Sequence, residues 1–200
     1  MSVVAAFSPS MPDDPNEDVV LMLKVKLGDE QAFEELIARH QARILGTVAK
    51  MLGNATDAED ISQQVFVRVW QSASRYQPTA KFTTWLLTIT RNLVFNEMRR
   101  LRRAKFVPMD VETEDHAPRD IADETNPDAA QAAATADLQV AISRAIATLP
   151  EQQRLALILR RYEELSYEEI AAVLKTSVPS VKSLLFRART MLKDQLHGYL

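Results

Sequence analysis

The chain has 200 residues, of which 46% are hydrophobic and 26% are charged, as in a soluble globular protein with one ordinary domain or two small ones. It has no cysteine, which excludes disulfides, thiol catalysis and cysteine-based zinc sites, and its three histidines lie far apart in sequence. Glycine is scarce, and Ala, Leu, Glu, Gln and Arg dominate. We therefore expect an all-α protein with no metal and no cofactor.

Residues 1–18 are predicted to form a flexible tail, because they are rich in Ser, Pro and Asp. They lack the basic segment and the long apolar segment of a secretory signal. No window of the chain approaches the roughly 20 apolar residues of a membrane helix. We expect a cytoplasmic protein without membrane insertion.

Residues 19–103 have the pattern of a first helical domain. From Val19 to Leu52 the apolar residues recur at helical spacing, and Gly53-Asn54 is a suitable helix end. Thr56 and Glu59 have the form of a capping box, which predicts a helix start there. That second helix should bury its apolar stripe of Ile61, Val65, Phe66 and Val69.

A third helix is predicted from about Thr83 to Arg103, after the break at Tyr76-Gln77-Pro78. Its apolar residues include Trp85, which lies at a core position, so we expect it to pack inside the domain. The helix ends in a cluster of arginines. Residues 104–137 then read as a flexible acidic linker that three prolines interrupt, with helix only near its end.

Residues 138–200 should form a second helical domain. Pro150 suits a first helical turn, and Ser166 with Glu169 forms another capping box. Lys175-Thr176 is predicted to be a turn and Ser177 the N-cap of a final helix. Two helices around so short a turn are typical of a helix-turn-helix, whose second helix enters the major groove of DNA.

The final helix separates its residues by face. Its buried stripe is predicted to be Val181, Leu185, Ala188 and Leu192, and the opposite stripe holds Ser180, Lys182, Ser183, Phe186, Arg187 and Thr190. Lys182 and Arg189 can neutralise phosphates, Arg187 can read a guanine, Ser183 can contact a base or the backbone, and Phe186 can meet a thymine methyl group. The alternative is a solvated basic helix end that suits the helix dipole.

Four segments in this order resemble the conserved regions of extracytoplasmic-function (ECF) sigma factors of the sigma-70 family. They are GDEQAFEELIARHQARI, DAEDISQQVFVRVW, FTTWLLTITRNLVFNEMRRLRR and LPEQQRLALILRRYEELSYEEIAAVLKTSVPSVKSLLFRARTML. The resemblance implies a sigma-2-like helical bundle at 19–103 and a sigma-4-like helix-turn-helix at 138–200. It also implies a factor that binds core RNA polymerase, recognises the −35 and −10 promoter elements and helps to open the promoter.

The resemblance also assigns residues. Contacts with the clamp helices of the largest polymerase subunit would come from Asp57, Asp60, Gln63, Gln64 and Arg68. The −10 element would be held, with one flipped base, by Tyr76, Lys81, Phe82, Thr84, Arg91, Asn92, Asn96, Arg99 and Arg100. The −35 element would be read as duplex by Ser180, Lys182, Ser183, Phe186, Arg187, Arg189 and Thr190. Many relatives are held inactive by an anti-sigma protein, which is a further expected partner.

Other readings remain open at this point. For Asp57–Trp70 the alternative is a capped surface helix with ordinary acidic residues. An enzyme is not expected, since the chain has no phosphate-binding glycine loop, nucleophile motif or metal cluster. A stand-alone dimeric regulator would leave the first domain without a role. A decoy that only sequesters an inhibitor would not need the basic DNA-facing residues.

Overall fold

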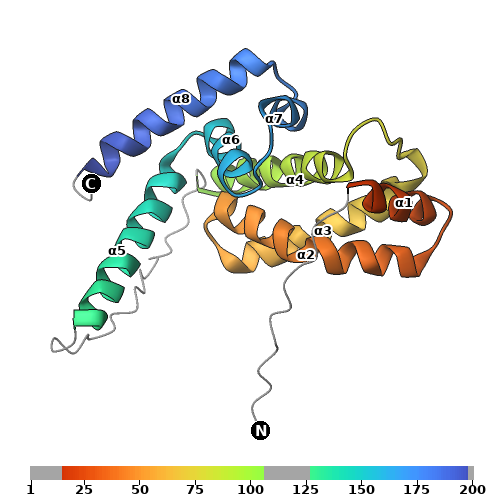
Figure 1. The fold of residues 1–200 in the computed structure, drawn as a ribbon, viewed down its shortest axis with the longest axis horizontal. Coiled ribbons are helices and arrows are strands. Elements are labelled where there is room, and N and C mark those ends of the chain that lie inside the picture. Colours follow the sequence, from red (N-terminus) through yellow and green to blue (C-terminus); the bar gives the residue numbers. More distant parts are fainter. Residues whose placement is uncertain (1–14, 106–126, 198–200) are drawn as a thin grey trace, which may run out of the picture. The chain divides into compact units, whose positions relative to one another are not determined.

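A computed structural model of the chain describes residues 15–105 and 127–197 (Figure 1). Every regular element in these ranges is helical, as the sequence predicted. The elements are α1 (Pro15–Lys26), α2 (Glu30–Leu52), α3 (Ala55–Ser72), the 3-10 turn η1 (Ala73–Arg75), α4 (Phe82–Lys105), α5 (Pro127–Thr148), α6 (Glu151–Arg161), α7 (Tyr167–Leu174) and α8 (Val178–Gln195).

The chain divides into two compact units. The first contains Met1–Ala49 and Asn54–Leu93, and the second contains Lys50–Gly53 and Val94–Leu200. Most of the predicted acidic linker, at 106–126, lies outside the described residues. Its last part, at 127–137, belongs to helix α5. None of the described helices is long and apolar enough to cross a membrane.

The first unit is built around side chains that α1, α2, α3 and α4 each contribute. Met22, Leu36, Val65 and Leu86 are all at most 1% exposed. Burying four such side chains contributes on the order of 1.5–3 kcal/mol each. The predicted stripe of α3 is confirmed, since Ile61, Val65, Phe66 and Val69 are all buried.

The start of the first unit differs from the prediction in two ways. Residues 15–18 are helical, and Asp18 is fully buried, so the predicted tail of 1–18 extends too far. The helical pattern from Val19 to Leu52 is broken at Gly28, whose φ of 95° favours glycine. Asp29 then caps the start of α2, because its Oδ1 accepts a hydrogen bond from the Ala32 amide at 3.0 Å.

The cap of α3 also differs from the prediction. Asn54 is the N-cap, and its side-chain oxygen accepts a hydrogen bond from the Thr56 amide at 3.0 Å. The predicted capping box of Thr56 and Glu59 is therefore wrong, because the helix starts before Thr56. Asn is as good an N-cap as Ser or Asp, and in this chain it lies closer to the turn.

In the second unit α6, α7 and α8 pack against one another, and α5 packs on α8. The predicted capping box of α7 is confirmed: the Glu169 amide donates to Ser166 Oγ at 3.1 Å, and the Ser166 amide donates to Glu169 Oε2 at 2.8 Å. Ser177 caps α8 as predicted. Between α7 and α8, Lys175 takes a left-handed conformation with φ of 53°.

Candidate nucleic-acid and protein interfaces

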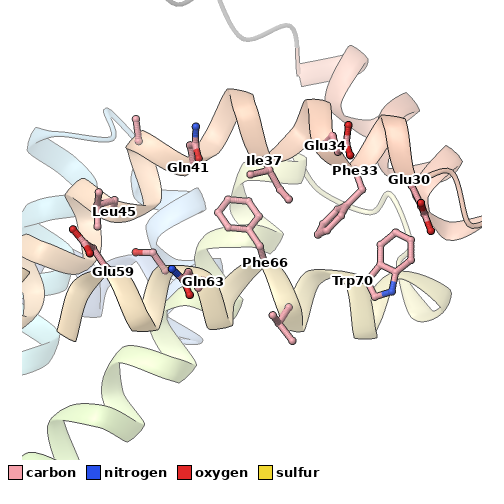
Figure 2. Close-up of a pocket in the computed structure, with 13 residues that line it drawn as sticks. Glu30, Phe33, Glu34, Ile37, Gln41, Leu45, Glu59, Gln63, Phe66 and Trp70 are labelled. Carbon is pink, nitrogen blue, oxygen red and sulfur yellow. The ribbon is translucent and has the colours of Figure 1, made fainter. Parts of the chain in front are cut away.

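A groove of about 1030 Å³ runs between α2 and α3 in the first unit. Figure 2 shows Phe33 and Ile37 of α2 facing Phe66 and Trp70 of α3 across it. The Phe33 and Trp70 rings lie 5.0 Å apart, centroid to centroid. Trp70 keeps 39% of its surface exposed and Val67 of the same groove keeps 55%. Apolar side chains this exposed and this close together are typical of a protein-binding surface.

The charges around the groove favour one kind of occupant. Glu30, Glu34 and Glu59 lie along its lining, together with the neutral Gln41 and Gln63. An apolar floor with carboxylates beside it is complementary to an amphipathic helix that carries Lys or Arg next to its apolar stripe.

The predicted polymerase contacts on α3 separate into two groups. Gln63 lines the groove. Asp60, Gln64 and Arg68 recur every four residues, so they lie along another exposed strip of α3, near Asp57 at its start. Phe33, Val67 and Trp70 were not predicted as contacts. In the sequence, each of them is an apolar residue just outside the predicted buried positions of its helix.

The −10 candidates in and next to the loop between η1 and α4 differ in how exposed their side chains are. Lys81 is exposed, as are the other side chains of Gln77–Lys81. Tyr76, Phe82 and Thr84 are at most 5% exposed. The sequence placed these three among the residues that hold the −10 element, but they belong to the interior of the unit, so the structure does not present them to a DNA strand.

The interior under this loop is an aromatic cluster. The ring of Tyr76 lies 5.0 Å from that of Trp85 and 6.4 Å from that of Phe82. Trp85 therefore packs in this cluster, as predicted, although its side chain is only half-buried. Burial raises the pKa of the Tyr76 hydroxyl, and the nearby Asp18 carboxylate adds to the shift.

Helix α4 presents a polar strip further along. Asn92, Asn96, Arg99 and Arg103 are exposed at spacings of four, three and four residues, so they share one face. Asn96 and Arg99 line a hollow together with Arg102 and Arg103. Arg99 donates to the side-chain oxygen of Asn96 at 2.5 Å and to the Phe95 carbonyl at 3.2 Å. Such a strip can follow a phosphate backbone while the amides meet base edges.

Two predicted arginines of α4 differ from this strip. Arg100 makes a two-point hydrogen bond to Glu97, at 2.8 and 2.6 Å, which lowers the pKa of that carboxyl. Glu97 therefore partly neutralises the charge of Arg100 even without a bound phosphate. Arg91 is half-buried, and burial lowers its pKa, although a guanidinium stays protonated at neutral pH. Arg91 donates to the Asn92 side-chain oxygen at 3.2 Å.

Helix α8 separates its residues by face as the sequence predicted, except that Leu192 of the predicted buried stripe is only half-buried. Val181, Leu185 and Ala188 are at most 2% exposed, whereas Phe186 keeps 71% of its surface exposed. Around Phe186 the exposed face carries Lys182, Ser183 and Thr190, with Arg187 and Arg189 beside it.

The hydroxyls of this face are held in place by the helix itself. Ser183 Oγ donates to the Pro179 carbonyl, and Thr190 Oγ1 donates to the Phe186 carbonyl, both at 3.1 Å. Ser180 and Ser177 share a hydrogen bond of 2.9 Å between their hydroxyls. Phe186 is apolar but exposed, which is unfavourable in water and favourable against a thymine methyl group or a sugar.

Comparison with known proteins identifies similar chains. The family model for "Sigma-70 region 2" matches residues 36–104, and the one for "Sigma-70, region 4" matches 139–192. The "RNA polymerase sigma-H factor" of Pseudomonas aeruginosa is 32% identical over 192 residues, which cover 92% of this chain and 96% of that protein. The "ECF RNA polymerase sigma-E factor" of Escherichia coli K12 is 31% identical, with 90% and 94% covered.

Among solved structures, the fold is similar to that of CnrH in its complex with the cytosolic domain of CnrY. The TM-score is 0.64 at 25% identity, and the match covers 91% of this chain and 98% of CnrH.

Proposed function

The chain belongs to the ECF sigma factors of the sigma-70 family, and from this premise we propose which surfaces perform the function of the family. A sigma factor directs RNA polymerase to promoters and takes part in transcription initiation. We assign polymerase binding to the first unit, −10 recognition to α4 with the loop before it, and −35 recognition to α8. The observation that carries this assignment is the exposed face of α8, where a phenylalanine lies among cations and hydroxyls.

Polymerase binding is proposed to use the groove between α2 and α3, with Gln63 at its edge and Asp57, Asp60, Gln64 and Arg68 on the adjoining strip of α3. The exposed Val67 and Trp70 supply apolar area that polar residues alone do not. Most of the affinity for the complex would come from burying this area, and the acidic residues beside it would select basic partners. Such binding would place the protein in the cytoplasm.

Promoter binding is proposed to use two different chemistries. On α4, the Asn92–Arg103 strip and Lys81 would hold a single strand, whose bases must leave the stack to be read. On α8, Lys182 and Arg189 would contact phosphates while Phe186 and Arg187 meet base edges in the major groove. With a net charge of −3 the chain has little attraction of its own for DNA, so binding would depend on the polymerase.

An anti-sigma protein is a further proposed partner. The similar CnrH structure is a complex with the cytosolic domain of CnrY. An anti-sigma protein that covered the apolar groove would exclude polymerase, because both would occupy the same surface.

One pair of matched variants tests the groove assignment. Val67→Glu places a carboxylate in the groove, whereas Val20→Glu makes the same change on α1, where Val20 is 47% exposed and lies outside the groove. Burying an unpaired carboxylate should weaken core polymerase binding at least ~10-fold in Val67→Glu. Val20→Glu should bind as the unchanged protein does. If Val67→Glu binds normally and Gln64→Ala does not, polymerase occupies the other strip of α3.

A further inference from the structure

The loop Gln77–Lys81 carries five exposed side chains but is anchored at both ends. At its far end the Lys81 carbonyl accepts hydrogen bonds from the amides of Thr84 and Trp85, at 3.1 and 3.3 Å. Inside it, the Thr79 amide donates to the Gln77 carbonyl at 2.8 Å. The backbone of the loop is therefore held in one conformation at the start of α4.

The near end of the loop is held by a residue distant in sequence. Lys26, at the end of α1, donates from Nζ to the Tyr76 carbonyl at 2.9 Å, across 50 residues of sequence. Tyr76 is the last residue before the loop, and its extended backbone, with φ of −62° and ψ of 132°, directs the chain into it. The position of α1 therefore determines where the loop begins.

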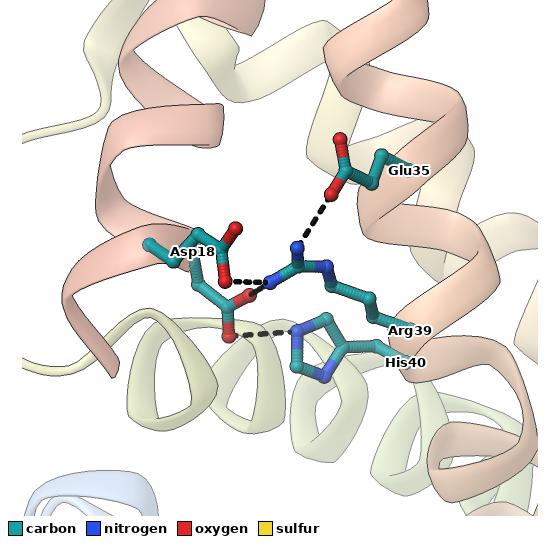
Figure 3. Close-up of polar contacts among 5 residues, drawn as sticks. Asp18, Glu35, Arg39 and His40 are labelled. Carbon is teal, nitrogen blue, oxygen red and sulfur yellow. Dashed lines mark hydrogen bonds and ion pairs between the residues drawn. The ribbon is translucent and has the colours of Figure 1, made fainter. Parts of the chain in front are cut away.

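Helix α1 is itself fixed to the aromatic cluster under the loop. Figure 3 shows Asp18 of α1 facing Arg39 and His40 of α2. Asp18 Oδ2 lies 2.9 Å from His40 Nε2, and both side chains are fully buried. The His40 ring packs on Phe82 at 5.3 Å, so the same group that holds α1 also supports the first residue of α4.

We propose that Lys26 is a positioning residue for −10 recognition: its ammonium group fixes the Tyr76 carbonyl and so presents the loop Gln77–Lys81 to the unpaired strand in one conformation. This inference rests on the proposed role of the loop. A pre-ordered loop loses less conformational entropy when it binds, and it can distinguish the correct base from an incorrect one because it does not adapt to both.

The chain offers a matched control for this proposal. Lys26→Met keeps the aliphatic stem and removes the donor, and Lys26→Arg restores a charged donor. Lys24→Met removes the same charge from the same helix at an exposed position. A general loss of positive charge would affect Lys24→Met and Lys26→Met alike, whereas loss of the loop anchor would affect only the second.

The measurement uses holoenzyme made from the full chain and core polymerase. Open complex is quantified by permanganate reactivity on a promoter fragment that the unchanged holoenzyme uses and on copies with one −10 base replaced. Lys26→Met should lower the preference for the correct base about 5- to 10-fold, which is within the range of the net contribution of one hydrogen bond. Lys26→Arg should retain most of the preference, and Lys24→Met should retain all of it. Core affinity should be the same for every variant.

Hydrogen exchange of the free protein separates the inference from the proposed function. Lys26→Met should exchange the amides at 79–82 faster than Lys24→Met does. Equal exchange in the two variants would overturn the anchor. Faster exchange with an unchanged base preference would overturn its role in recognition. If the unchanged holoenzyme opens no promoter at all, the proposed function fails as well.

Discussion

Replacing Asp18 by alanine should destabilise the first unit more than any surface change on α1. The Asp18 carboxylate is fully buried, lies 2.9 Å from His40 Nε2 and lies 3.5 Å from Arg39 Nη1. His40 is also fully buried, and its Nδ1 has no hydrogen-bond partner among the described residues. Without Asp18, His40 Nε2 would lose its partner, and neither ring nitrogen would have one among the described residues.

The size of the loss follows from this geometry. Leaving a buried polar group without its partner costs about 1–3 kcal/mol, and separating a buried ion pair costs about 3–5 kcal/mol. We expect a loss of about 3 kcal/mol, where the two ranges meet. Since a domain is stable by about 5–15 kcal/mol, such a loss is easily measured.

Tryptophan fluorescence in urea is a selective assay for this loss. The two tryptophans of the chain, Trp70 and Trp85, both belong to the first unit, so their signal follows that unit alone. Glu17→Ala is the control: Glu17 also pairs with Arg39, at 2.9 Å, but its side chain is 55% exposed, so only a small change is expected.

The pair can also be removed as a whole. Asp18→Leu combined with His40→Phe should recover most of the stability, because apolar replacement of a buried polar pair is often neutral. A loss below about 1 kcal/mol for Asp18→Ala would contradict this role of Asp18, since it would mean that His40 finds another partner.

Three further predictions test other parts of the structure. Tyr76→Phe should leave stability near neutral pH unchanged or slightly higher, because the buried Tyr76 hydroxyl has no partner in the described residues. The folded-state pKa of Tyr76 is raised, so the stability of the unchanged protein should fall above about pH 10, and that of the variant should fall less. Urea titration at several pH values measures both effects. Lys175→Gly should slow amide exchange in α7 and α8 by relieving about 1 kcal/mol of left-handed strain, whereas Lys175→Val should speed it. Arg187→Ala should weaken holoenzyme binding to a −35 duplex about 10- to 100-fold, and Phe186→Ala should weaken it without loss of stability, as measured by fluorescence anisotropy.

The sequence predicted the helices whose signals are local. The capping box of Ser166 and Glu169 and the cap at Ser177 depend on residues three positions apart, so pattern alone located α7 and α8. The faces of α8 followed from the period of a helix, and Leu185 and Phe186 lie on the faces expected of them.

What the sequence could not predict depends on contacts between distant residues. Asp18 looked like part of an acidic tail, and its burial depends on His40, which is 22 residues away. Tyr76 was expected to help hold the −10 element with its flipped base, but it is buried, and Trp85 and Phe82 pack against it. The groove depends on how α2 and α3 lie side by side, so Phe33 and Trp70 could not be paired from their positions in the chain.

In vitro transcription tests the central proposal most directly. The purified chain is added to bacterial core polymerase on a library of promoter fragments. We expect initiation to require this chain, to occur on fragments that share two separated elements, and to be lost in Val67→Glu because that variant fails to bind core polymerase. Core binding without initiation on any fragment would contradict it in favour of a decoy that sequesters an inhibitor. DNA binding without core binding would contradict it in favour of a stand-alone regulator.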